Sequence, residues 1–287
     1  MTAIYLKEVK SYFRSLTGWL YSAFILIFAG IYTMVYNLAY GYSQFEYVLE
    51  SMAFVFLIAC PILTMRTFAE EKHSKTDQLL YSLPLNMSSV ATAKFLAILT
   101  VNLVPCVIMC AYPVLLGTFG TINLKAAYSS LIMFYLLGAS LNSIGMFISS
   151  ITENQVASAV ITIVVMLLIY FGSALSGFVS DTAFGSLAAL CALALIISCV
   201  LYIFTRNGFV AGISLIVLAG GLLIAYAISS ASFEGLFPDI MDKLSLFERF
   251  YTVVEGVFDL TAIVYYVTIS GVFLFLTTQS LEKRRWG

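Results

Sequence analysis

Residues 66–84, RTFAEEKHSKTDQLLYSLP, separate two long apolar stretches, and the rest of the chain is organised around them. Charged side chains fill the first half of this segment. Leu79, Leu80 and Leu83 follow at helical spacing, and Pro84 ends the pattern. We therefore expect a short amphipathic helix with a charged start and an apolar end, held between two membrane spans. Such a helix is suited to docking onto a partner.

The composition is that of a membrane protein. The 287 residues are 61% hydrophobic and only 10% charged, with a mean hydropathy of +1.00. Several apolar runs exceed the ~18 residues that mark a candidate transmembrane helix. These runs are continuous, whereas the strands of a β-barrel would alternate apolar and polar residues. The sequence therefore predicts an all-α, polytopic transmembrane bundle that forms a single domain over residues 1–287.

Hydropathy predicts eight spans, each close to the ~20 residues that a bilayer requires. The sixth and seventh are separated only by residues 205–208, so the number falls to six if this pair does not cross. The predicted spans are roughly 17–39, 47–65, 91–117, 126–150, 156–178, 184–204, 209–229 and 261–280.

Lysine and arginine set the predicted orientation, because they are enriched in cytoplasmic loops. With the N-terminus inside, all of the 14 Lys and Arg residues except Lys125, Lys243 and Arg249 fall on the cytoplasmic side, and most acidic residues fall outside. Both termini are then cytoplasmic, which agrees with an even number of spans.

Two amphipathic segments flank the spans. Residues 1–16 predict a helix that lies along the membrane, with Lys7, Lys10 and Arg14 facing anionic headgroups. On the outer side, apolar residues of the segment 230–260 recur at steps of three and four, which predicts one or two amphipathic helices. That segment either caps a pathway or rests on lipid.

Several function classes lack their motifs. The chain has no GxxxxGK[ST] sequence for ATP, no paired catalytic groups, and no cofactor or metal motif. A net charge of −1 without a long basic block argues against a nucleic-acid partner. No Asp, Glu, Lys, Arg or His lies near a predicted span midpoint, which argues against ion- or proton-coupled transport. If the chain moves a substrate uphill, another subunit must supply the energy.

Uncharged polar residues do occur within the spans. They are either helix–helix hydrogen-bonding groups or groups that line a substrate pathway. The candidates are Asn102, Asn142, Ser173 and Ser176.

Three segments resemble a known family. Residues 70–76 and 79–84, EEKHSKT and LLYSLP, resemble the first cytoplasmic loop of type 2 ABC exporter permeases, although Lys75 stands where glycine is usual. Residues 149–155, SSITENQ, look like the second cytoplasmic loop of that family. The C-terminal part, from Ser245 to Trp286, is similar to its gliding-motility branch.

The resemblance implies a division of labour. The chain would form the pathway with a second permease subunit, identical or different, in the plasma membrane of a bacterium. Two cytoplasmic ATPase subunits would bind ATP and Mg²⁺, and residues 66–90 would be the loop that couples them to the spans. Export is the function implied. The alternative is a membrane component of an ABC-type machine for envelope assembly, sensing or motility. The predicted ATPase-coupling residues are Glu70, Glu71, Lys72, Thr76, Leu79, Leu80, Leu83 and Glu153.

Overall fold

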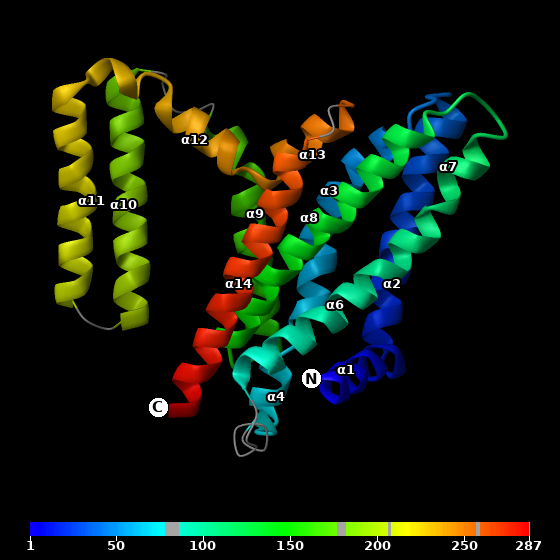
Figure 1. Ribbon diagram of the computed structural model, residues 1–287, viewed down its shortest axis with the longest axis horizontal. Coiled ribbons are helices and arrows are strands. Elements are labelled where there is room, and N and C mark those ends of the chain that lie inside the picture. The colour runs from blue at the N-terminus through cyan, green and yellow to red at the C-terminus, as the bar shows by residue number, and fades with distance from the viewer. Residues whose placement is uncertain (78–85, 177–181, 206–207, 257–258, 287) are drawn as a thin grey trace. The chain divides into compact units, whose positions relative to one another are not determined.

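The computed structural model describes residues 1–77, 86–176, 182–205, 208–256 and 259–286 (Figure 1). Within these ranges the regular structure is helical and no strand occurs, so the predicted all-α fold is confirmed. The helices are α1 (Thr2–Arg14), α2 (Leu16–Thr33), the π-helix η1 (Met34–Ala39), α3 (Glu46–Thr64), α4 (Ala69–His73), α6 (Met87–Met109), α7 (Ala111–Leu116), α8 (Leu124–Ile151), α9 (Gln155–Ser176), α10 (Ala183–Thr205), α11 (Gly208–Ile228), the 3₁₀-helix η2 (Ser230–Phe233), α12 (Leu236–Leu244), α13 (Leu246–Val254) and α14 (Leu260–Trp286).

Six helical stretches in the described part of the chain are long and apolar enough to cross a membrane, which confirms a polytopic protein. They are Leu16–Ala39, Glu46–His73, Met87–Leu116, Leu124–Ile151, Gln155–Gly172 and Leu260–Arg285.

The predicted sixth and seventh spans correspond to α10 and α11, whose bounds differ from the prediction by one residue at each end. The continuously described apolar parts of these helices, Ala183–Leu195 and Gly212–Ile228, are shorter than a span. Crossing by this pair therefore stays a prediction.

The chain divides into two compact units. The first consists of residues 1–167 and 249–287, and the second of residues 168–248. In the second unit, α10 and α11 pack side by side, and η2 and α12 lie against α10. The Ser214 hydroxyl donates a hydrogen bond to the Ser198 hydroxyl at 3.2 Å and so links α10 and α11.

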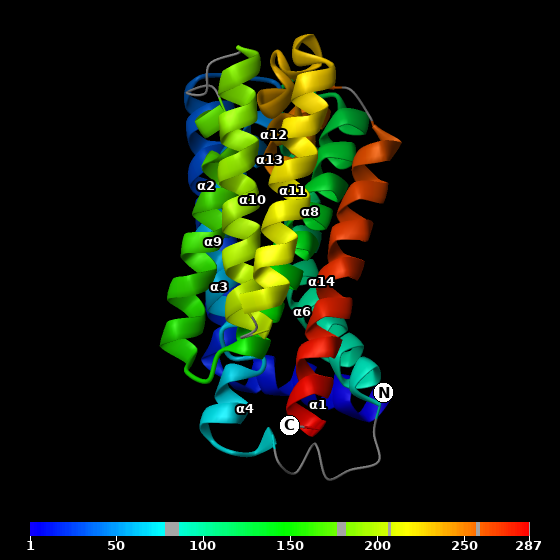
Figure 2. The same cartoon turned by 90° about the vertical axis from the view of Figure 1, so that its left-hand side faces the viewer.

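In the first unit, α8 is the central helix. It packs against α3, α6 and α14. In the apolar 18-residue stretch of α8, 78% is buried, compared with 17% of the corresponding stretch of α14. The amphipathic helix α1 packs across α6 and α2. Both chain termini and α4 lie at the same end of this unit (Figures 1 and 2).

Two glycines allow α3 and α8 to approach closely, as small residues do in membrane helix pairs. A Cβ atom on Gly138 would lie 2.8 Å from the Phe56 ring, and one on Gly145 would overlap the Thr64 hydroxyl. The rings of Phe56 and Phe134 stack between the same helices, with centroids 4.4 Å apart. The two helices therefore touch along their length.

Candidate functional site

The short helix α4 follows α3 after a four-residue turn, and α8 caps its start. The first N–H groups of a helix have no partner within the helix. Here the Ser149 hydroxyl accepts hydrogen bonds from the backbone N–H groups of Phe68 and Ala69, both at 3.1 Å, and it donates to the Met65 carbonyl at 3.4 Å. The C-terminal turn of α8 thus fixes where the polar loop begins.

The end of α4 corrects the sequence prediction of one continuous amphipathic helix. The helix ends at His73, and Lys75 has a φ of +57°, in the left-handed region. The Thr76 N–H bonds to the Glu71 carbonyl at 2.9 Å, and the Lys75 N–H bonds to the Lys72 carbonyl at 3.1 Å. These two bonds form a Schellman motif, which usually has glycine at the left-handed position. The hydrophobic pattern of the sequence does not reveal this reversal.

Replacing Lys75 by glycine is expected to stabilise this turn. A left-handed conformation costs an L-residue roughly 1–2 kcal/mol, and the greater chain entropy of glycine offsets about half of that gain. Amide exchange at residues 75 and 76 should slow by about 2- to 5-fold. Ser74, at φ −82°, provides the control, because glycine there relieves no strain and should speed exchange. Equal acceleration by both variants would contradict the motif.

Lys94, in the second turn of α6, is the hub of the site. Its side chain is 2% exposed, and its ammonium lies 2.8 Å from Glu71 Oε1 and 3.3 Å from Glu8 Oε1. It also donates to the Thr67 carbonyl at 2.8 Å and lies 5.0 Å from the centre of the Phe68 ring. An ammonium has three N–H donors, and three oxygens surround this one. Lys94 therefore joins α1, α4 and the turn before α4.

Two further contacts attach α1 and α2 to the same turn. Arg66 forms a two-point ion pair with Glu70, at 2.6 and 2.8 Å, and donates to the Thr17 hydroxyl at 2.5 Å. The buried Tyr12 hydroxyl donates to the Leu63 carbonyl at 3.4 Å and lies 3.2 Å from the Thr67 hydroxyl. Burial raises the pKa of Tyr12 above its ordinary value, because the charged form would lose its hydration.

The last turn of α8, where the second polar loop begins, is bound to α4 and α14. The Lys72 ammonium donates to the Ser150 carbonyl, which also accepts a hydrogen bond from the Ser280 hydroxyl of α14 at 3.3 Å. Because the Lys72 side chain is buried, its ammonium group lies within the contact between α4 and the last turn of α8.

Arg284, near the end of α14, bridges the two loops. Its Nη1 lies 3.0 Å from Glu153 Oε1 of the second loop, and its Nε lies 3.3 Å from Asp77 Oδ2 of the first. The sequence places Arg284 among the cytoplasmic Lys and Arg residues and predicts no contact for it. The structure therefore adds the C-terminal helix to the site.

The structure thus brings together four of the eight predicted coupling residues, Glu70, Glu71, Lys72 and Glu153, at one end of the first unit. Thr76 forms the second residue of the turn after α4, and its exposed hydroxyl lies 3.0 Å from that of Ser74. Leu79, Leu80 and Leu83 lie outside the described residues. Contact of all eight with a partner stays a prediction.

Of the four predicted pathway residues, the structure describes the side chains of Asn102 and Asn142. Asn102 is buried between helices, where it accepts from the Tyr21 hydroxyl at 2.6 Å and donates to the Tyr135 carbonyl at 3.4 Å. Asn142 is fully buried and close to the Tyr21 hydroxyl. No described residue lies in hydrogen-bonding geometry with its side-chain amide. Ser173 and Ser176 belong to α9, and their side chains lie outside the described part.

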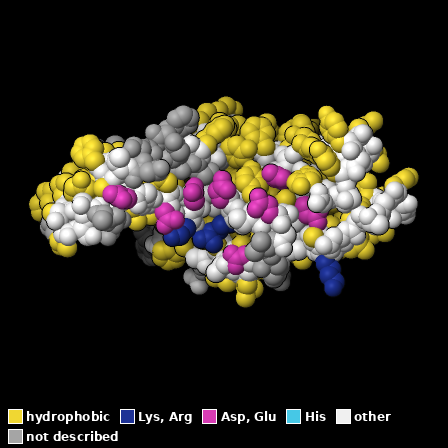
Figure 3. Space-filling model, turned by 90° about the horizontal axis from the view of Figure 1, so that it is seen from above, with side chains coloured by type: hydrophobic (Ala, Val, Ile, Leu, Met, Phe, Trp, Pro, Cys, Tyr) yellow, Lys and Arg dark blue, Asp and Glu magenta, His cyan; other side chains and the backbone are white. Residues whose placement is uncertain are grey.

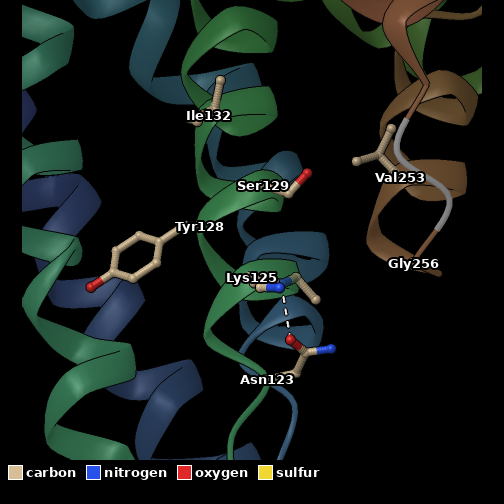
Figure 4. A pocket seen from close by; sticks show the side chains of 8 residues that line it. Asn123, Lys125, Tyr128, Ser129, Ile132, Val253 and Gly256 are labelled. Atoms are coloured by element: carbon tan, nitrogen blue, oxygen red, sulfur yellow. Dashed lines mark hydrogen bonds between the residues drawn. The ribbon is translucent and has the colours of Figure 1, made fainter.

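At the opposite end of the first unit, the start of α8, the end of α13 and Gly256 line an open hollow of about 540 Å³ (Figure 4). The Ser129 hydroxyl points to the side on which Val253 lies and has no hydrogen-bond partner among the described residues. Viewed from this end, acidic side chains are spread among apolar ones (Figure 3). Among the described residues that line this hollow, no combination of groups typical of catalysis occurs.

Comparison with known protein families identifies a match over most of the chain. Residues 32–231 match the model of a family described as "ABC-2 family transporter protein". The matched range includes α3, α4, α8 and both apolar helices of the second unit. No curated protein matches the chain.

Proposed function

The chain belongs to the ABC-2 family of transporter proteins, and from this premise we propose that it couples ATP hydrolysis in separate cytoplasmic ATPase subunits to export. As an ABC-2 permease subunit it spans the membrane several times. Two ATPase subunits supply ATP and Mg²⁺ binding, and a second permease subunit, identical or different, completes the pathway. The site of action is the plasma membrane of a bacterium.

The observation that carries the coupling proposal is the linkage of α4, the second loop and the end of α14 into one block. Lys94, Lys72 and Arg284 each bridge different elements of this block. A partner that moves α4 therefore also displaces α3, α6 and α8, because packed helices respond as units. This block lies at the end with both termini and most basic residues, which supports a cytoplasmic location.

The three leucines after α4 provide the test. We expect Leu79→Asp or Leu83→Asp to prevent docking, because an unpaired carboxylate in an apolar interface is costly. The chain would be expressed with the products of neighbouring genes, purified through its C-terminus and assayed for ATPase activity in lipid. Each variant should reduce the co-purified ATPase and its activity at least tenfold, while insertion in the membrane stays normal.

Leu124→Asp is the matched control, because Leu124 starts α8 at the opposite end and is exposed. It should leave ATPase binding unchanged. If the wild-type chain purifies without a nucleotide-dependent partner, or if the Leu79 and Leu83 variants bind the ATPase normally, the coupling proposal is wrong.

The C-terminal segment favours a more specific assignment. The residues from Ser245 onward lie beyond the family match and resemble the gliding-motility branch. We propose this branch as the finer relationship. The alternative function is then that of a membrane component of an ABC-type machine that does mechanical work without transport. Transport in reconstituted vesicles separates the two functions, since only an exporter accumulates or releases substrate with ATP.

A further inference from the structure

The outward face of α1 has a cationic groove that the coupling site does not use. Its volume is about 480 Å³, and it is lined by Lys7, Lys10, Ser11, Arg14 and Ser15. The two lysines and the arginine are exposed, and none of them forms an ion pair with a described residue. Three cations and two hydroxyls around one hollow are suited to binding a phosphate group.

Contacts on the other face of α1 fix the direction of this groove. The Tyr5 hydroxyl lies 2.9 Å from the Thr100 hydroxyl of α6, and Glu8 pairs with Lys94 at 3.3 Å. Tyr12 is buried against the end of α3. Since these residues hold α1 on the protein, Lys7, Lys10 and Arg14 must face away from it.

An apolar rim lies beside the groove. Leu16 is 75% exposed, and Trp19 is 58% exposed. The Trp19 indole donates to the Phe13 carbonyl at 2.9 Å, and the two rings meet edge to face with centroids 5.6 Å apart. A tryptophan held at the junction of an amphipathic helix and a membrane span is typical of the bilayer interface.

We propose that this groove is a binding site for the phosphate headgroup of an anionic phospholipid, whose acyl chains lie against Leu16 and Trp19. The headgroup phosphate takes the place of a carboxylate partner for Lys7, Lys10 and Arg14. Free phosphate shares this chemistry, but the apolar rim favours a lipid. Each cation near an anionic surface contributes about 1 kcal/mol, so three predict a preference on the order of 100-fold for anionic over zwitterionic lipid.

Trp19 provides a reporter for the test. The chain has two tryptophans, and Trp286→Phe leaves Trp19 as the only one. The full chain would be reconstituted in vesicles of phosphatidylcholine with increasing brominated phosphatidylglycerol, whose bromines quench indole fluorescence on contact. The reverse series, with brominated phosphatidylcholine, gives the relative affinity. We expect strong preference for phosphatidylglycerol, and loss of that preference in the Lys7→Gln, Lys10→Gln, Arg14→Gln variant.

Lys125→Gln, which removes an exposed cation at the opposite end, should retain the preference. If the triple variant does not fold, each single replacement should reduce the preference by about 5-fold. Equal quenching by both lipids, or an unchanged preference in the triple variant, would overturn the proposal. Full displacement of the phospholipid by millimolar inorganic phosphate at constant ionic strength would also overturn the proposal, because it would assign the groove to a soluble ligand. The test needs no ATPase and does not depend on the coupling proposal.

Discussion

Replacing Lys94 by methionine should lower the free energy of unfolding by about 3–5 kcal/mol, the usual cost of removing one partner from a buried ion pair. Methionine matches the length of the lysine stem, so packing is largely kept. Stability would be lost because the carboxylates of Glu8 and Glu71 would stay mostly buried without the cation that they share. Thermal and denaturant unfolding of the purified chain in detergent would measure it.

Two variants separate this electrostatic cost from a general effect of losing a lysine. Lys125→Met removes an exposed cation and should change stability by less than about 0.5 kcal/mol. Adding Glu8→Gln and Glu71→Gln to Lys94→Met should recover most of the loss, because neutral amides need no counter-charge. If Lys94→Met is no worse than Lys125→Met, the ammonium does not hold the site together.

The second large effect is expected at Gly145. Leucine at this position cannot fit while α3 stays in place, because the first side-chain carbon would already lie 3.0 Å from Thr64 Cβ and would overlap the Thr64 hydroxyl. Forcing side chains into a tightly packed contact usually costs 1–3 kcal/mol. We expect Gly145→Leu to lower the free energy of unfolding by about 3 kcal/mol. A fall in the unfolding temperature would measure this loss.

Gly271, in α14, is the matched control, because a Cβ there would meet nothing within 4 Å. Gly271→Leu should be neutral or slightly stabilising, since leucine has the higher helix propensity. A milder pair tests the contact itself. Thr64→Ala, which removes the hydroxyl and methyl group, should restore part of the stability lost in Gly145→Ala. Equal losses at the two glycines would show that close packing is not the cause.

Hydropathy predicted the positions of the helices well, because a lipid environment requires long apolar helices whose backbone groups bond internally. The ends of α8, for example, differ from the predicted span by two residues at the start and one at the end. The break after His73 could not be predicted in the same way. Its left-handed residue is a lysine, which gives no sequence signal for such a turn.

The centre of the site was missed for a different reason. The sequence places Lys94 among the cytoplasmic Lys and Arg residues, whereas its partners Glu8 and Glu71 come from separate elements. The available signal was one lysine close to a long apolar run, since an ionisable group there usually has a buried partner. Sequence alone could not identify that partner, because no local spacing relates α1, α4 and α6.

The contact at Gly138 and Gly145 has a mechanical consequence. The first polar loop continues from α3, the second continues from α8, and the two helices are in close contact at both glycines. Both loops are therefore attached to one closely packed helix pair. We therefore expect a displacement of either loop to move α3 and α8 together, so that both loops act on one motion of the helix pair.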